Sequence, residues 1–60
     1  DEIDSYKQAI RIDPDYVAAH YNLGFAMYQQ GDKAAALDEY KILKKIDKEA
    51  AEKLFNEIYR

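Results

Sequence analysis

His20 is the only histidine in this 60-residue chain and the side chain best suited to acid–base chemistry or metal binding. Glu49, Glu52 and Glu57 could join it as metal ligands or as an acid–base partner. These glutamates share the charged back of a predicted helix, where solvated side chains are the usual outcome. The chain has no Cys or Thr, and Ser5 is its only Ser. We therefore predict no catalytic residue, no metal site and no cofactor, and hence no enzyme.

The spacing of His20 favours a structural role. It shares a helical stripe with Val17, Gly24 and Tyr28, so we interpret it as a histidine at a contact between helices. A contact with a partner is the alternative. Its charge could change near neutral pH in either case.

The charge pattern argues against nucleic acid as a partner. The net charge is −3, and the basic strip of Lys41, Lys44, Lys45 and Lys48 is surrounded by acids. We interpret this strip as a solvated face with i,i+4 ion pairs. No signal peptide is recognisable, and the uncharged segment 16–31 is too short and too polar for membrane insertion. We expect a soluble protein; the compartment stays unknown, with the cytoplasm favoured.

Apolar residues recur at helical spacing throughout the chain and predict four helices, at about 2–12, 15–29, 33–46 and 48–59. No segment has the polar–apolar alternation of a strand. The connections are short, so successive helices should be antiparallel neighbours. We predict an all-α fold of helix-turn-helix units.

Short polar signals mark the ends of these helices. Asp13 is expected to cap the second helix, with Pro14 in its first turn. Gly31 is expected to end that helix in the left-handed conformation. Asp32 and Asp47 should cap the third and fourth helices.

The second helix differs from the others because it is apolar nearly all round, which predicts burial between neighbouring helices. Gly24 in its middle costs about 1 kcal/mol relative to Ala. We expect that a helix must approach closely there, with Ala36 as the small counterpart. In the last helix, Ala51, Leu54, Phe55 and Ile58 form the expected inner stripe.

The chain also repeats itself with a period of 34 residues. At that shift, identical residues coincide in the pairs Asp4/Asp38, Tyr6/Tyr40, Lys7/Lys41, Ile12/Ile46 and Asp13/Asp47. A 34-residue period with two helices per unit is that of the tetratricopeptide repeat.

Residues 17–50 resemble one complete repeat of the tetratricopeptide repeat (TPR) family, and the resemblance rests on Leu23-Gly24, Gly31-Asp32, Ala36 and Tyr40. Residues 1–16 resemble the second helix and turn of a preceding repeat. Residues 51–60 resemble a C-terminal capping helix, which begins near residue 48. The resemblance implies the C-terminal end of an α-solenoid array. A first helix without its usual preceding helix implies either excision from a longer array or self-association.

The resemblance implies a non-catalytic scaffold for protein–protein interaction that binds a peptide or protein segment in a groove lined by the 15–29 helix. The family's groove positions fall on Ala18, Tyr21, Asn22, Phe25, Tyr28 and Gln29. None of these residues is basic, so the chain lacks the family's clamp for a C-terminal carboxylate. The alternative is a structural module that uses the same aromatic surface for homo-oligomerisation.

Overall fold

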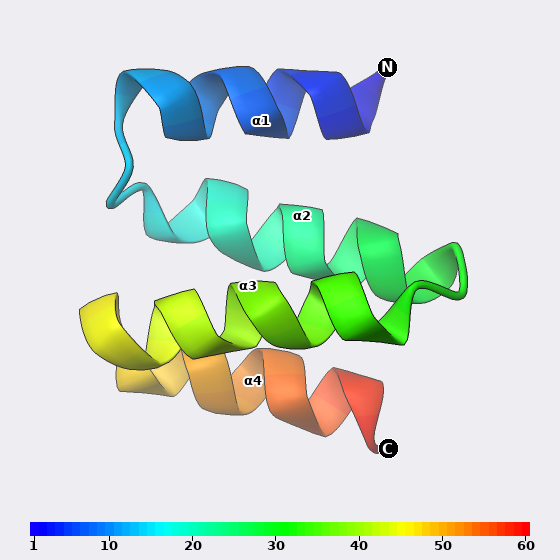
Figure 1. The fold of residues 1–60 in the computed structure, drawn as a ribbon. Coiled ribbons are helices and arrows are strands. Elements are labelled where there is room, and N and C mark those ends of the chain that lie inside the picture. Colours follow the sequence, from blue (N-terminus) through cyan, green and yellow to red (C-terminus); the bar gives the residue numbers. More distant parts are fainter.

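The computed structural model describes residues 1–60 and contains four α-helices that run antiparallel in succession (Figure 1). They are α1 (Glu2–Ile12), α2 (Val17–Gln29), α3 (Lys33–Ile46) and α4 (Lys48–Ile58). The predicted all-α class and the number of helices are confirmed. None of the helices combines the length and the apolar character that crossing a membrane would require.

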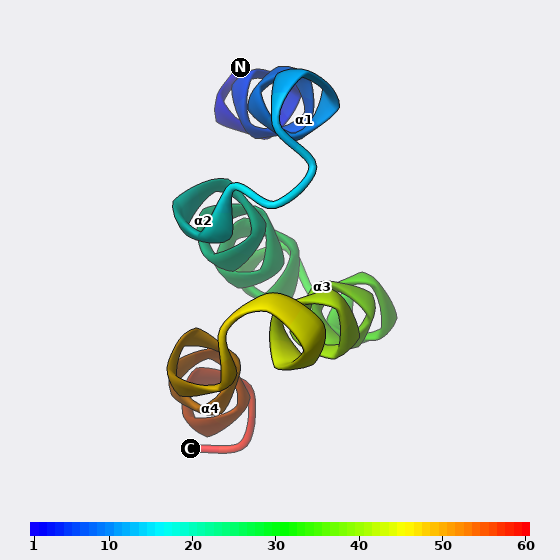
Figure 2. The ribbon, with the colours of Figure 1, turned by 90° about the vertical axis from the view of Figure 1, so that its left-hand side faces the viewer.

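α2 occupies the centre of the molecule. It contacts α1, α3 and α4, whereas α1 contacts α2 alone. Viewed nearly end-on, α2, α3 and α4 form a triangle and α1 lies outside it, beyond α2 (Figure 2). The apolar residues distributed around α2 are thus explained by three neighbouring helices, as the sequence predicted.

The buried core lies within that triangle. Its largest cluster of buried residues comes from α3 and α4 and consists of Ala36, Leu43, Ala51, Leu54 and Ile58. Ala19 and Leu23 of α2 are also buried. Half-buried side chains of α2, including Tyr21, Phe25 and Tyr28, pack against this cluster. α1 contributes no buried residue, and Ile12 at its end is 86% exposed. The apolar burial that stabilises the fold is therefore concentrated away from α1.

Most of the residues predicted to begin or terminate the helices do so in the structure. Asp32 accepts a hydrogen bond from the backbone N–H of Ala35 (N···O 3.0 Å). Asp47 accepts from the backbone N–H groups of Glu49 (3.1 Å) and Ala50 (3.3 Å). Gly31 has a φ of 86°, in the left-handed region that favours glycine. These predicted caps are confirmed.

The start of α2 was predicted wrongly. The helix begins at Val17 rather than near residue 15, and its N-cap, Tyr16, makes no side-chain hydrogen bond to the helix. Asp13 ends α1, and its carboxylate accepts from the backbone N–H of Asp15 (3.2 Å). Pro14 consequently lies in the connecting loop, because the Asp13 turn takes up the side chain that would have capped α2.

Gly24 allows the expected close approach, but its neighbours are not the predicted ones. A Cβ at this position would lie 2.7 Å from Leu54 Cδ2 and 3.1 Å from Glu39 Cβ. Ala36, the predicted counterpart, belongs instead to the buried cluster of α3 and α4. The absent side chain at Gly24 thus makes room for both α3 and α4.

We expect Gly24→Ala to destabilise the chain, because Leu54 is fully buried and cannot move freely away from a new methyl group. Overpacking costs about 1–3 kcal/mol, and the better helix propensity of Ala recovers up to about 1 kcal/mol. Urea unfolding monitored by circular dichroism measures the net loss. Asn22→Ala, at an exposed position of the same helix, is the control. A Gly24→Ala chain more stable than the parent would disprove the crowding at this contact.

Candidate partner-binding surface

The predicted binding residues of α2 fall into two groups by exposure. Ala18, Asn22 and Gln29 are exposed. The aromatic residues Tyr21, Phe25 and Tyr28 are half-buried and pack against the core. The aromatic residues therefore also support the fold, and only part of each ring is free to contact a partner.

One groove collects three of the predicted residues. It lies between α2 and α4, encloses ≈ 540 Å³, and includes Ala18, Tyr21 and Asn22 among its lining residues. The remaining lining residues are Val17, Asp47, Glu49, Ala50 and Lys53. The predictions missed the α4 side of this groove, because sequence spacing reveals the face of one helix but not which helix lies beside it.

The α2–α4 groove combines an apolar base with a few polar groups. Val17, Ala18 and Ala50 supply aliphatic surface. The Asn22 amide makes no hydrogen bond within the chain, so it is free both to donate and to accept. Lys53 forms no ion pair and adds a positive charge on the α4 side.

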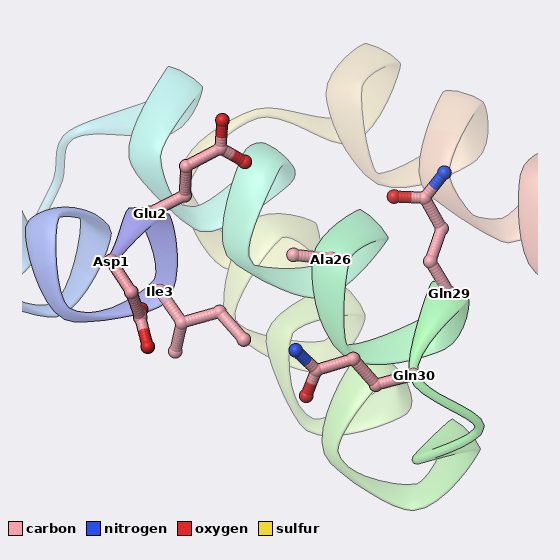
Figure 3. Close-up of a pocket in the computed structure, with 6 residues that line it drawn as sticks. All are labelled: Asp1, Glu2, Ile3, Ala26, Gln29 and Gln30. Carbon is pink, nitrogen blue, oxygen red and sulfur yellow. The ribbon is translucent and has the colours of Figure 1, made fainter.

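Gln29 lies elsewhere, in a cleft of ≈ 290 Å³ between the start of α1 and the end of α2. Figure 3 shows Ala26 pointing toward α1 and Ile3 extending toward Gln30. Asp1 and Glu2 complete the lining. Phe25 and Tyr28 line neither this cleft nor the α2–α4 groove. The structure therefore gathers Ala18, Tyr21 and Asn22 but not the other three predicted residues.

His20 has the predicted structural position at a contact between helices. It is buried, its Nδ1 lies 2.7 Å from Glu39 Oε1, and its Nε2 lies 2.7 Å from the Pro14 carbonyl oxygen. Burial lowers the pKa of His20, but the hydrogen bonds to Glu39 and Pro14 and the charges of Glu39 and Asp15 raise it more, so the pKa lies above 6.5.

The structure pairs His20 with a different carboxylate from those considered in the sequence. Its partner is Glu39 of α3, and no group of three or more His, Cys, Asp or Glu side chains is arranged to hold a metal ion. Sequence reasoning missed Glu39. The available signal was that a buried histidine requires polar partners, but which acid supplies one depends on how α2 and α3 align.

An aromatic cluster on α3 and α4 also went unpredicted. The ring centroids of Tyr40 and Phe55 are 5.3 Å apart, and those of Phe55 and Tyr59 are 4.7 Å apart. Lys33 Nζ lies 4.1 Å from the centroid of Tyr59. Phe55 is 40% exposed, so its assignment to the inner stripe of α4 was wrong. The i,i+4 spacing of Phe55 and Tyr59 was the available signal.

The lysine strip is solvated, as expected, but its predicted ion pairs are absent. Lys41, Lys44, Lys45 and Lys48 are exposed, and none of them forms a salt bridge. Lys44 Nζ instead lies 5.4 Å from the centroid of the Tyr40 ring. Lys44 and Lys45 lie in the last turn of α3, where the helix dipole favours cations without requiring acidic partners.

Comparison with known proteins gives one match. A family model described as a TPR repeat matches residues 3–31, which comprise most of α1, the connecting loop, α2, Gln30 and Gly31. No curated protein and no solved structure matches the chain. The matched segment contains all the predicted binding residues and Gly24, but not Glu39 and Leu54, which Gly24 contacts.

Alanine substitutions should separate the two groups of predicted residues by their effect on stability. Phe25→Ala removes a half-buried ring that packs on the core, so it should lower the free energy of unfolding by about 1–3 kcal/mol. Gln29→Ala removes an exposed side chain and should change it by less than about 0.5 kcal/mol. Chemical denaturation of both variants provides the comparison; equal losses would contradict the division.

Proposed function

We propose that the chain is a non-catalytic module that binds an extended segment of a partner protein, because a TPR repeat model matches residues 3–31 and proteins of the tetratricopeptide repeat family generally mediate protein interactions. The proposed binding site is the α2–α4 groove. The observation that carries this proposal is the convergence of Ala18, Tyr21 and Asn22 with Ala50 and Lys53 at one surface. The proposal also takes α2 and α3, within residues 17–50, as one repeat unit.

The groups in the groove support an extended segment as its occupant. The backbone of such a segment presents alternating N–H and C=O groups, and the free Asn22 amide can pair with one of each. Val17, Ala18 and Ala50 leave room for a small apolar side chain of the partner. The Tyr21 hydroxyl can stay hydrogen-bonded while its ring contacts that side chain.

The charges of the groove support a partner segment without a required terminal carboxylate. Lys53 is the only basic residue in the lining, and it is accompanied by the acids Asp47 and Glu49. The Asp47 carboxylate is already engaged by the first turn of α4. Glu49 makes no ion pair, so a basic side chain next to the apolar one fits this end of the groove.

A selection from a displayed library of random peptides tests this proposal. Peptides that bind the chain should lose at least about tenfold in affinity to an Ala18→Glu variant, because the new carboxylate lies where the apolar side chain binds. Asn22→Ala should weaken binding by about three- to tenfold through the lost backbone hydrogen bonds. Isothermal titration calorimetry measures both changes.

Ala34→Glu is the matched control, because Ala34 is exposed on α3 and lines none of the observed grooves. It makes the same substitution and the same change of charge at a different surface. Equal affinity of the selected peptides for the Ala18→Glu and Ala34→Glu variants would disprove the groove as the binding site. Sedimentation velocity over a range of concentrations tests the alternative, in which a second copy occupies this surface. Dimerisation abolished by Ala18→Glu alone would favour that alternative.

A further inference from the structure

His20 makes two short contacts, and both are to hydrogen-bond acceptors. Nδ1 faces a carboxylate oxygen of Glu39 in α3, and Nε2 faces the carbonyl oxygen of Pro14 in the α1–α2 loop, each at 2.7 Å. The side chain is 4% exposed, so water has little access to either ring nitrogen. No other side chain joins this loop to α3 through hydrogen bonds.

Two acceptors require two donors. A neutral imidazole carries one N–H, and its other nitrogen is an acceptor. In the neutral form, one lone pair of the ring would face an oxygen at 2.7 Å without a proton between them, at a buried position. The imidazolium satisfies both contacts, because both of its nitrogens donate.

We propose that His20 is a pH-responsive clamp that in its charged form ties the α1–α2 loop to α2 and α3, and that loss of its proton releases the loop and α1. The two contacts should respond differently to that loss. A carboxylate is a stronger acceptor than a peptide carbonyl, so the remaining proton stays on Nδ1 and keeps the bond to Glu39. The bond that is lost joins Nε2 to Pro14.

α1 depends on this bond more than any other helix would. It contacts only α2, and it contributes no buried residue to the core. The loop that leads from it into α2 also lacks the usual anchor, because the N-cap Tyr16 makes no side-chain hydrogen bond, whereas α1, α3 and α4 are all capped by aspartates. The hydrogen bond from His20 to Pro14 therefore holds the start of α2 in place, as a capping side chain does at the other helices.

The surroundings of His20 determine the direction of the pH dependence. The charged groups that act on it are Glu39 from α3 and Asp15 from the loop, and none comes from α1 or α4. Together with the two hydrogen bonds they outweigh burial and hold the pKa above 6.5. A raised pKa means that the stabilisation is complete below pH 6.5 and is lost as the pH rises through the pKa of the folded chain. Release of α1 is therefore expected as the pH rises through this raised pKa, above pH 6.5.

NMR of the single histidine tests the clamp directly. At pH 6, the ring nitrogen signals should show protons on both Nδ1 and Nε2, and their titration midpoint should lie above 6.5. Hydrogen-exchange protection factors of α1 amides, corrected for intrinsic exchange, should fall across the same pH range, while those of α3 and α4 persist. A midpoint at or below 6.5, or α1 protection that does not change through the titration, would overturn the proposal.

Two variants identify the groups responsible. Glu39→Gln keeps an acceptor oxygen but removes the charge, and it should move both the histidine midpoint and the loss of α1 protection to lower pH by the same amount. Asp15→Asn changes an exposed residue and should shift both in the same direction by less. This second variant keeps the test decisive if Glu39→Gln does not fold.

Glu57→Gln is the matched control, because Glu57 pairs with Arg60 and does not act on His20. It makes the same chemical change as Glu39→Gln at a distant ion pair and should leave the histidine midpoint in place. An equal shift in the Glu57→Gln and Glu39→Gln variants would also overturn the proposal.

Discussion

The contact between Gly24 and Leu54 sets the spacing of the three central helices. Leu54 is fully buried, and its Cδ2 occupies the space that a side chain on Gly24 would need. Glycine within a helix costs about 1 kcal/mol, whereas complete burial of a leucine side chain contributes about 1.5–3 kcal/mol. The gain from burying Leu54 therefore exceeds the cost of placing glycine within the helix. The close approach of α2 to α3 and α4 therefore stabilises the fold despite the poor helix propensity of glycine.

The same spacing creates the α2–α4 groove. Because α2 lies against α4 along one side, its neighbouring residues Ala18, Tyr21 and Asn22 come to face Ala50 and Lys53. The rings of Tyr21, Phe25 and Tyr28 pack inward, which leaves the amide of Asn22 and the methyl of Ala18 as the accessible groups. The aromatic rings of α2 thus pack against the core, whereas its small and polar side chains are exposed to a partner.

Local patterns in the sequence were sufficient to predict the helices and most of their ends. The contacts between helices could not be predicted from these local patterns. Asp32, Asp47 and Gly31 act within one turn of their own positions, so their roles could be predicted. Asp13 failed as a predicted cap because a competing local turn uses its side chain.

The candidate site shows the same limit. The spacing of residues along α2 could identify one face of the helix, but it could not show that Gln29 lies in a different cleft from Asn22. The pairing of His20 with Glu39 and the outward position of Phe55 depend on how separate helices align. Alignment of this kind arises from tertiary packing and leaves no short-range pattern in the chain.

The peripheral position of α1 has a consequence for the order in which the chain folds. Nearly all contacts join helices that are adjacent in sequence, and only the α2–α4 contact skips one. Such local topology favours folding on the microsecond-to-millisecond scale. We expect α2, α3 and α4 to form the nucleus because the core lies among them, and α1 to add last, as repeat arrays propagate from one unit to the next. In this order of events, the α2–α4 contact, which spans the whole of α3, forms before α1 docks against α2.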